Sequence, residues 1–284
     1  MPKQTDVVIE ETPQYPRQVR LDTIARCNAT CLSCHRFNTK RNGEMPVELF
    51  MKLLRDIGSW TQPLVETVPV NYGEFFLRKD WAWILEMIEK YLPNTNIVIP
   101  TNGSLLDDKA VDLLCQIQTL LLVNFSINAF FDDTYEAFMK LPAETIPKIR
   151  KAMERIKALR PEVYIRASMV FDPMYQTDSE RDLFANHWKD IAEICIIPAA
   201  SCGRDKPVVL PNKLPCRSIF KDLVVGYDGK LSNCCWDSNF TIPLGEYSGN
   251  LLKDWMNPKM EGLRKLHNEH RRDEIEICKF CSFA

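Results

Sequence analysis

Three cysteines near the N-terminus, Cys27, Cys31 and Cys34, place the strongest constraint on what this 284-residue chain can form. They follow a short apolar run and have the spacing C-x3-C-x2-C. Three thiolates are one fewer than the four that a [4Fe–4S] cluster normally takes. The fourth ligand is then either a distant side chain or a molecule bound to an open iron, and the second arrangement is a reactive centre.

Two alternatives to an iron–sulfur cluster have to be weighed at the triplet. The same spacing fits one face of a helix, on which cysteines can be buried as small apolar side chains. However, Asn28, Thr30 and Ser33 favour caps and turns, and no apolar periodicity continues beyond Cys34. Zinc is the stronger rival, although zinc sites commonly use cysteines in C-x2-C pairs. The triplet therefore favours metal ligation.

Composition indicates an ordinary soluble globular protein, with 45% hydrophobic and 26% charged residues. A net charge of -2 gives no electrostatic basis for nucleic-acid binding. The sequence shows neither a signal peptide nor an apolar run long enough to cross a membrane. We therefore expect a cytoplasmic protein, whose eleven cysteines are reduced thiols or metal ligands rather than disulfides.

Strand-like and helix-like segments alternate along the first two thirds of the chain. The period-two and buried apolar patterns predict strands over residues 18–24, 64–70, 97–99, 120–127, 163–171 and 194–197. Helical periodicity predicts helices over residues 46–58, 81–91, 107–118, 133–140, 145–159 and 179–193. Repeated strand–helix units predict a parallel sheet with right-handed crossovers, closed as a barrel or doubly wound.

The pattern changes after residue 198. Residues 199–215 lack periodicity, and residues 222–231 read as a hairpin whose turn is Asp228–Gly229. Helices are expected over residues 251–256 and 259–270. We expect an extended lead-in over 1–16, a main domain over 17–198 and a small domain over 199–284.

A C-x3-C-x2-C loop directly after the first strand of such a series resembles the radical S-adenosylmethionine (SAM) superfamily. The resemblance implies an α/β fold, a partial (β/α)6 TIM-like barrel over residues 17–198. It also implies that Cys27, Cys31 and Cys34 hold a [4Fe–4S] cluster whose open iron is chelated by SAM. Reductive cleavage of SAM would then give a 5′-deoxyadenosyl radical that abstracts hydrogen from a substrate at the barrel mouth.

The resemblance also implies a set of SAM-binding residues at the strand ends. Glu74, in the segment Tyr72-Gly73-Glu74, would accept a hydrogen bond from the SAM amino group. Arg166 would pair with the SAM carboxylate, which the fixed fork of a guanidinium suits. A plain turn at residues 101–103 and simple solvent exposure of Arg166 are the alternatives. The complete implied set is Gly73, Glu74, Thr101, Asn102, Ser126, Asn128 and Arg166.

One position departs from the family pattern. Many members of the superfamily have an aromatic residue just before the third cysteine, and this chain has Ser33 there.

The C-terminal cysteines resemble the SPASM extension of the superfamily in its shortened "twitch" form. The resemblance implies an auxiliary [4Fe–4S] cluster held by Cys216, Cys234, Cys278 and Cys281. Four protein ligands leave no open iron, which favours electron transfer over substrate ligation. Structural zinc fits the same four thiolates and is the alternative.

Cys235 is adjacent to the expected ligand Cys234. Neighbouring side chains in an extended segment face opposite ways, so Cys235 is either a buried thiol or a catalytic hydrogen donor. We expect Cys115, Cys195 and Cys202 to be structural.

A SAM-binding cluster combined with a fully ligated auxiliary cluster predicts an oxidoreductase. In a dehydrogenase acting on a small molecule, the auxiliary cluster would accept the second electron, and a flavodoxin or ferredoxin would be the electron donor. Sixteen polar lead-in residues are too few for a peptide-binding domain, which favours a small substrate over a peptide. The alternatives are an epimerase with Cys235 or Cys202 as the hydrogen donor, a peptide-modifying maturase, and a non-catalytic metal-binding or electron-carrier protein.

Overall fold

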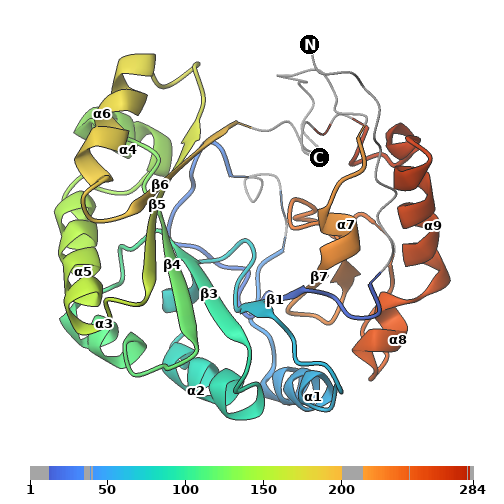
Figure 1. Cartoon of the computed structure of the whole chain (residues 1–284). Helices are drawn as coiled ribbons and strands as arrows, with labels where there is room; N and C mark the ends of the chain where they lie inside the picture. Colours follow the sequence, from blue (N-terminus) through green and yellow to red (C-terminus); the bar gives the residue numbers. More distant parts are fainter. Residues whose placement is uncertain are drawn as a thin grey trace.

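The computed structural model describes residues 13–34, 39, 41–199, 214–242, 244–279 and 281. A curved sheet runs through both halves of the chain, with helices on its outer side (Figure 1). In these residues the sheet has eight strands, in the order β6-β5-β4-β3-β2-β1-β7-β8. The predicted partial (β/α)6 barrel is confirmed by the first six strands, which are mutually parallel. They are β1 (Gln18–Leu21), β2 (Glu66–Val68), β3 (Asn96–Thr101), β4 (Leu120–Ser126), β5 (Tyr164–Phe171) and β6 (Glu193–Pro198).

The barrel helices cover the convex face of the sheet. Helix α1 shows why: Phe50, Leu53, Leu54 and Ile57 recur at helical spacing and are all buried. The helices of this layer are α1 (Val47–Gly58), α2 (Trp81–Tyr91), α3 (Asp108–Leu114), α4 (Asp132–Met139), α5 (Thr145–Leu159) and α6 (Asp178–Trp188). No helix in the described ranges is both long and apolar enough to span a membrane.

The predicted C-terminal hairpin is present, but it extends the barrel sheet. Strand β7 (Asp222–Val225) pairs in parallel with β1 and antiparallel with β8 (Leu231–Ser232). Gly229 has a φ of +83° in the hairpin turn, a conformation that glycine adopts without strain. The hairpin therefore lies next to the strand that leads into the cysteine triplet.

The remaining C-terminal helices are α7 (Ser218–Lys221), α8 (Leu251–Trp255) and α9 (Pro258–Asn268), followed by a 3-10 turn, η3 (Arg272–Glu274). Of these helices, α8 packs beside α1, whereas α7 contacts α9 and β7 (Figure 1). Asp56 at the end of α1 accepts hydrogen bonds from the Tyr247 hydroxyl over 2.9 Å and from the Leu251 N–H over 2.6 Å. These contacts fix the C-terminal region to the barrel.

Several boundaries differ from the sequence prediction; the helix expected over residues 107–118, for example, ends at Leu114. Two of the differences have a visible local cause. The helix expected over residues 179–193 ends at Trp188, whose carbonyl accepts from the N–H groups of Ile191 and Ala192 in a turn, and Glu193 already begins β6. The first strand ends at Leu21 rather than at residue 24, because Ile24 pairs with Glu44 in an isolated antiparallel bridge.

Candidate functional site

The loop between β1 and α1 carries the cysteine triplet, all of it half-buried. The sulfur of Cys27 accepts hydrogen bonds from the Ala29 N–H over 3.4 Å and from Asn102 Nδ2 over 3.9 Å. Burial, together with the neighbouring thiols of Cys34 and Cys27, raises the pKa of Cys31 to about 12. Thiols this crowded can be deprotonated together when a metal centre supplies positive charge. The donor set therefore fits a metal cluster.

Gly73 lies against the start of this loop, where only glycine fits. A Cβ at this position would lie 2.0 Å from the Ile24 carbonyl oxygen and 2.8 Å from that of Arg26. The next residue, Glu74, donates its N–H to the same Arg26 carbonyl over 2.8 Å. The Gly-Glu pair thus packs the loop after β2 directly against the residues that precede Cys27.

The Glu74 carboxylate joins two of the predicted cofactor segments. Its Oε1 accepts from Thr101 Oγ1 over 2.8 Å and from the Phe76 N–H over 3.2 Å, and its Oε2 accepts from the Asn102 N–H over 2.7 Å. Burial raises the pKa of Glu74, and the hydrogen bonds from Asn102 and Thr101 oppose this rise. The structure therefore brings Gly73, Glu74, Thr101 and Asn102 together around Cys27.

Two further residues of the implied SAM-binding set, Ser126 and Asn128, lie on the same edge of the sheet. Ser126 ends β4 and is half-buried, whereas Asn128 is buried with a φ of +63°. Asn128 Oδ1 accepts from the Val170 N–H over 2.7 Å, and its Nδ2 lies 3.0 Å from the sulfur of Met139. The Asn128 side chain thus links β4 to β5 and α4. Both residues stay predictions as cofactor contacts.

Arg166 lies away from this edge, toward the N-terminal ends of the strands. Its guanidinium forms an ion pair with Glu193, with 3.1 Å between Nη2 and Oε2. Both side chains line a cavity of about 510 Å³ on the concave face of the sheet, which we call the polar chamber. Its other polar lining residues are Gln18, Arg20, Glu66, Asn124 and Tyr164.

The polar chamber is unusual for a barrel, whose interior is normally filled by branched apolar side chains. Sequence analysis missed Arg20, Glu66, Asn124 and Glu193 as candidate site residues. A signal was available for Arg20 and Asn124, because each is a half-buried position between buried neighbours on its strand.

The four C-terminal cysteines surround one small cavity. Cys216, Cys234, Cys278 and Cys281 all line this space of about 120 Å³, which we call the cysteine cavity. Burial raises the pKa of Cys216, of Cys234 and, to about 12, of Cys278. The predicted ligand set of the auxiliary site is therefore assembled in space, although it comes from segments far apart in the sequence.

Four cysteine sulfurs around one cavity are the donor set of an iron–sulfur cluster. In the part of the chain that the structure describes, no three His, Cys, Asp or Glu side chains are placed to hold one metal ion. A zinc ion would need its thiolates at about 2.3 Å from a common point. Four thiolates spaced around a cavity fit the larger iron–sulfur cluster.

His267 and Arg272 line the same cavity and were not anticipated from the sequence. His267 is 1% exposed, and its Nδ1 accepts from the Cys216 N–H over 3.0 Å. Burial and the charge of Arg272 lower the pKa of His267 to about 4. Spacing could not reveal this residue, because it contacts Cys216 across 51 positions from the last turn of a charged helix.

Cys235 does not line the cysteine cavity. Its carbonyl accepts from Asn71 Nδ2 over 3.4 Å, and burial raises the pKa of its thiol, an effect that Arg20 opposes. This placement agrees with the expectation that Cys234 and Cys235 face opposite ways. Cys115 is buried in the barrel core and Cys195 is half-buried on β6, while Cys202 lies outside the described residues.

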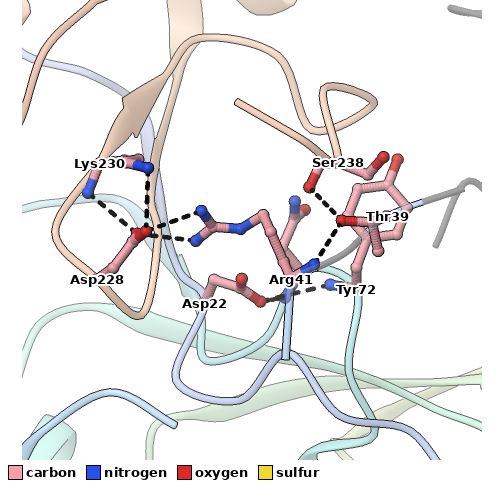
Figure 2. Close-up of polar contacts among 8 residues, drawn as sticks. Asp22, Thr39, Arg41, Tyr72, Asp228, Lys230 and Ser238 are labelled. Carbon is pink, nitrogen blue, oxygen red and sulfur yellow. Dashed lines mark hydrogen bonds and ion pairs between the residues drawn. The ribbon is translucent and has the colours of Figure 1, made fainter. Parts of the chain in front are cut away.

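Arg41 links the segment that follows the triplet to the C-terminal hairpin (Figure 2). Its guanidinium donates to both carboxylate oxygens of Asp228, over 3.0 and 2.8 Å. The guanidinium carbon lies 4.7 Å from the centroid of the Tyr227 ring and 4.2 Å from that of Phe240. Burial raises the pKa of Asp228, but the hydrogen bonds and charge of Arg41 outweigh it and hold that pKa below its usual value.

Two further contacts connect the same regions. Thr39 Oγ1 donates to the Ser238 carbonyl over 3.2 Å (Figure 2), and Asn71 binds the Cys235 carbonyl as described above. Since Ser238 and Cys235 flank the turn after Cys234, the cysteine triplet and the cysteine cavity are joined through Arg41 and its neighbours.

Fold and site together match one known family. Residues 21–187 match the family model of the radical SAM superfamily, and residues 216–282 match that of an iron–sulfur cluster-binding domain. The chain belongs to the radical SAM superfamily. It is a radical SAM enzyme, whose cofactors are SAM, a SAM-binding [4Fe–4S] cluster and an auxiliary [4Fe–4S] cluster, as predicted.

A curated relative and several solved structures match along nearly the whole chain. The S-adenosyl-L-methionine-dependent 2-deoxy-scyllo-inosamine dehydrogenase of Niallia circulans is 21% identical over 268 residues, which are 93% of this chain and 92% of the relative. The crystal structure of BtrN in complex with AdoMet and 2-DOIA gives a TM-score of 0.67 at 18% identity, over 94% of this chain and 93% of that one. Streptococcus suis SuiB bound to precursor peptide SuiA gives 0.71 at 14% identity, over 95% and 70% of the two chains. These structures support the fold.

Proposed function

We propose that the enzyme is a dehydrogenase that oxidises a small, polar, hydroxyl-bearing substrate by radical chemistry. The observation that carries this proposal is the cysteine cavity, because four cysteines around one space provide a fully ligated cluster. A cluster with no open iron suits electron acceptance. The 2-deoxy-scyllo-inosamine dehydrogenase relative supports the same reaction type.

We assign Cys27, Cys31 and Cys34 as ligands of the SAM-binding cluster. When bound, this cluster and SAM together supply one-electron reductive cleavage of the cofactor to a 5′-deoxyadenosyl radical. Glu74 and the Asn102 loop lie against Cys27, where they would hold the polar end of SAM beside the open iron. Ser126 and Asn128 on the same edge would contact its ribose.

Oxidation of a substrate alcohol to a carbonyl removes a hydrogen atom from carbon, one electron and the hydroxyl proton. The bound SAM would supply the 5′-deoxyadenosyl radical that takes the hydrogen atom. Cys216, Cys234, Cys278 and Cys281 would hold the auxiliary cluster that accepts the electron, and a base of the polar chamber would take the proton. An external flavodoxin or ferredoxin is the proposed partner in electron exchange.

We place the substrate in the polar chamber. Its volume of about 510 Å³ suits a small molecule, and its opposed charges, Arg20 and Arg166 against Glu66 and Glu193, suit hydroxyl and amino substituents. Arg166 also lines the polar chamber. We therefore propose that it contacts the substrate, in place of the contact with the SAM carboxylate that family resemblance implied. An aminated cyclitol, as in the name of the Niallia circulans relative, is a substrate of this kind.

Cofactor content tests the ligand assignment. The chain reconstituted anaerobically with iron and sulfide should hold about eight irons, four for each cluster. Replacing Cys27, Cys31 and Cys34 by alanine should remove about half of the iron and abolish 5′-deoxyadenosine formation in dithionite. Replacing Cys216, Cys234, Cys278 and Cys281 should remove the other half. Zinc in place of iron, or no cleavage of SAM, contradicts the proposal.

Deuterated substrates test the reaction type. We expect an aminocyclitol deuterated at the carbinol carbon to transfer deuterium into 5′-deoxyadenosine and to give a ketone. The Arg166→Ala variant should lose this transfer, whereas Arg155→Ala, which removes an exposed guanidinium on α5, should keep it. Deuterium transfer from a peptide alone would favour a maturase. Recovery of an epimerised alcohol that requires Cys235 would favour an epimerase.

A further inference from the structure

The His267 ring in the cysteine cavity has one nitrogen that the proposed ligand set does not explain. Its Nδ1 accepts a hydrogen bond from the Cys216 N–H over 3.0 Å. An imidazole nitrogen that accepts a hydrogen bond carries no proton, so the proton of the neutral ring is on Nε2. This tautomer makes Nε2 a donor and prevents it from ligating a metal.

Nε2 is buried and has no hydrogen-bond partner among the described residues. Because His267 is only 1% exposed, bulk water cannot accept a hydrogen bond from Nε2. Buried N–H groups without an acceptor are rare because they are destabilising. The ring lines a cavity whose other walls are the four cysteines, Arg272 and mostly apolar side chains such as Ile219 and Leu263. The acceptor that this geometry lacks is therefore one that binds in the cavity.

We infer that the Nε2–H of His267 donates a hydrogen bond to a sulfur atom of the auxiliary cluster and raises the reduction potential of that cluster. The inference rests on the proposed function, since it needs the four cysteines to be the ligands. A donor directed at a cluster sulfur stabilises the reduced state, which carries one more negative charge. Arg272, which lines the same cavity, acts in the same direction through its charge. Both residues favour the acceptance of an electron from a substrate radical.

A pair of isosteric variants separates the two ring nitrogens. His267→Asn keeps an acceptor close to the position of Nδ1, for the Cys216 N–H, and removes the donor. His267→Gln places an amide N–H near the position of Nε2 and removes the acceptor. The inference predicts a lower auxiliary-cluster potential in the Asn variant and a potential near that of the wild type in the Gln variant. A role confined to supporting Cys216 predicts the opposite order.

The measurement is an EPR-monitored redox titration of the full-length protein with both clusters, recorded with and without SAM to distinguish the two signals. His270→Asn is the matched control, because His270 is exposed, lies three residues further along and has a φ of 59°, which asparagine tolerates. Electron spin-echo spectroscopy of protein labelled with 15N-histidine provides a second readout. A weak 15N coupling to the auxiliary cluster should be present in the wild type and in His270→Asn and absent in His267→Asn.

Equal potentials in the wild type and both His267 variants, with full iron content, would overturn the inference alone. Loss of the cluster in both His267 variants would also overturn it, because His267 would then be needed for assembly. A wild-type protein that binds iron only at the first triplet would overturn the proposed ligand set and this inference with it.

Discussion

Arg41 and Asp228 lie 187 positions apart in the sequence, yet the guanidinium of one donates two parallel hydrogen bonds to the carboxylate of the other. Arg41 follows the cysteine triplet, and Asp228 forms the turn of the hairpin that leads to Cys234. The side chain of Arg41 is only 11% exposed and lies close to the rings of Tyr227 and Phe240. This pairing fixes the segment after the first cofactor loop to the domain that carries the second.

The first prediction concerns the Arg41→Lys variant. Lysine keeps the positive charge, but it cannot donate two parallel hydrogen bonds to Asp228 or stack a planar group on the rings of Tyr227 and Phe240. We therefore expect the free energy of unfolding to fall by about 1–2 kcal/mol. Urea unfolding under anaerobic conditions measures the change. Arg155→Lys is the control, because Arg155 makes the same bidentate contact with Asp112 at an exposed position, worth about 0–1 kcal/mol. Equal losses in the two variants would contradict the proposed role of Arg41.

The second prediction compares two glycine-to-alanine variants. In Gly73→Ala the new Cβ would lie 2.0 Å from the Ile24 carbonyl oxygen, so backbone must move beside the cysteine loop. We expect this variant to be less stable by about 3 kcal/mol or more and to lose the iron of the first cluster. In Gly262→Ala no atom lies within 4 Å of the Cβ, and removing a glycine from the middle of α9 should stabilise the fold by about 0.5–1 kcal/mol. Thermal unfolding and iron analysis test both, and a Gly73→Ala protein with normal iron would refute the expectation.

The third prediction concerns Glu74→Gln. The carboxylate accepts from three donors, and an amide group turns one of its oxygens into a donor facing another donor. We expect the SAM site to be stabilised by about 1–3 kcal/mol less, so the rate of 5′-deoxyadenosine formation in dithionite should fall by roughly 5- to 150-fold. Glu154→Gln, on the exposed face of α5, should have the wild-type rate. A wild-type rate for Glu74→Gln would show that this carboxylate does not organise the SAM site.

Local patterns in the sequence were sufficient for the barrel, whereas the cysteine sites were predicted from spacing together with family resemblance. Alternation of strands and helices predicted the parallel sheet, and the spacing of Cys27, Cys31 and Cys34 with their family resemblance predicted the first site. The parallel pairing of β7 with β1 could not be predicted, because no local pattern specifies which edge of a sheet a distant hairpin joins. His267 and Arg41 were missed for the same reason, since their roles depend on contacts across 51 and 187 positions.

The last prediction concerns Asp22, which is buried at the end of β1 beside Arg41. Its Oδ1 accepts from the Asn71 N–H over 3.1 Å. It also accepts from the Tyr72 N–H over 3.5 Å (Figure 2). Burial raises its pKa from 3.8 to about 6, against the opposing effects of these hydrogen bonds and of Arg41, while Asp228 adds to the rise. Because the folded state binds the proton more tightly than the unfolded state, stability falls as the pH rises from about 4 to 6 and then stays lower.

Asp22→Asn should remove the free-energy cost of ionising this buried carboxyl group, and its amide oxygen would still accept from the two backbone N–H groups. A shift of this size corresponds to about 3 kcal/mol, so the variant should be more stable than the wild type by about 1–3 kcal/mol at pH 7 and by less at pH 5. Comparing the variant with the wild type at each pH by urea unfolding cancels the contributions of other titrating groups, Glu74 among them. A difference between the two proteins that does not change between pH 5 and 7 would mean that Asp22 is ionised throughout. In that case the charge of Arg41, rather than burial, would control this carboxylate.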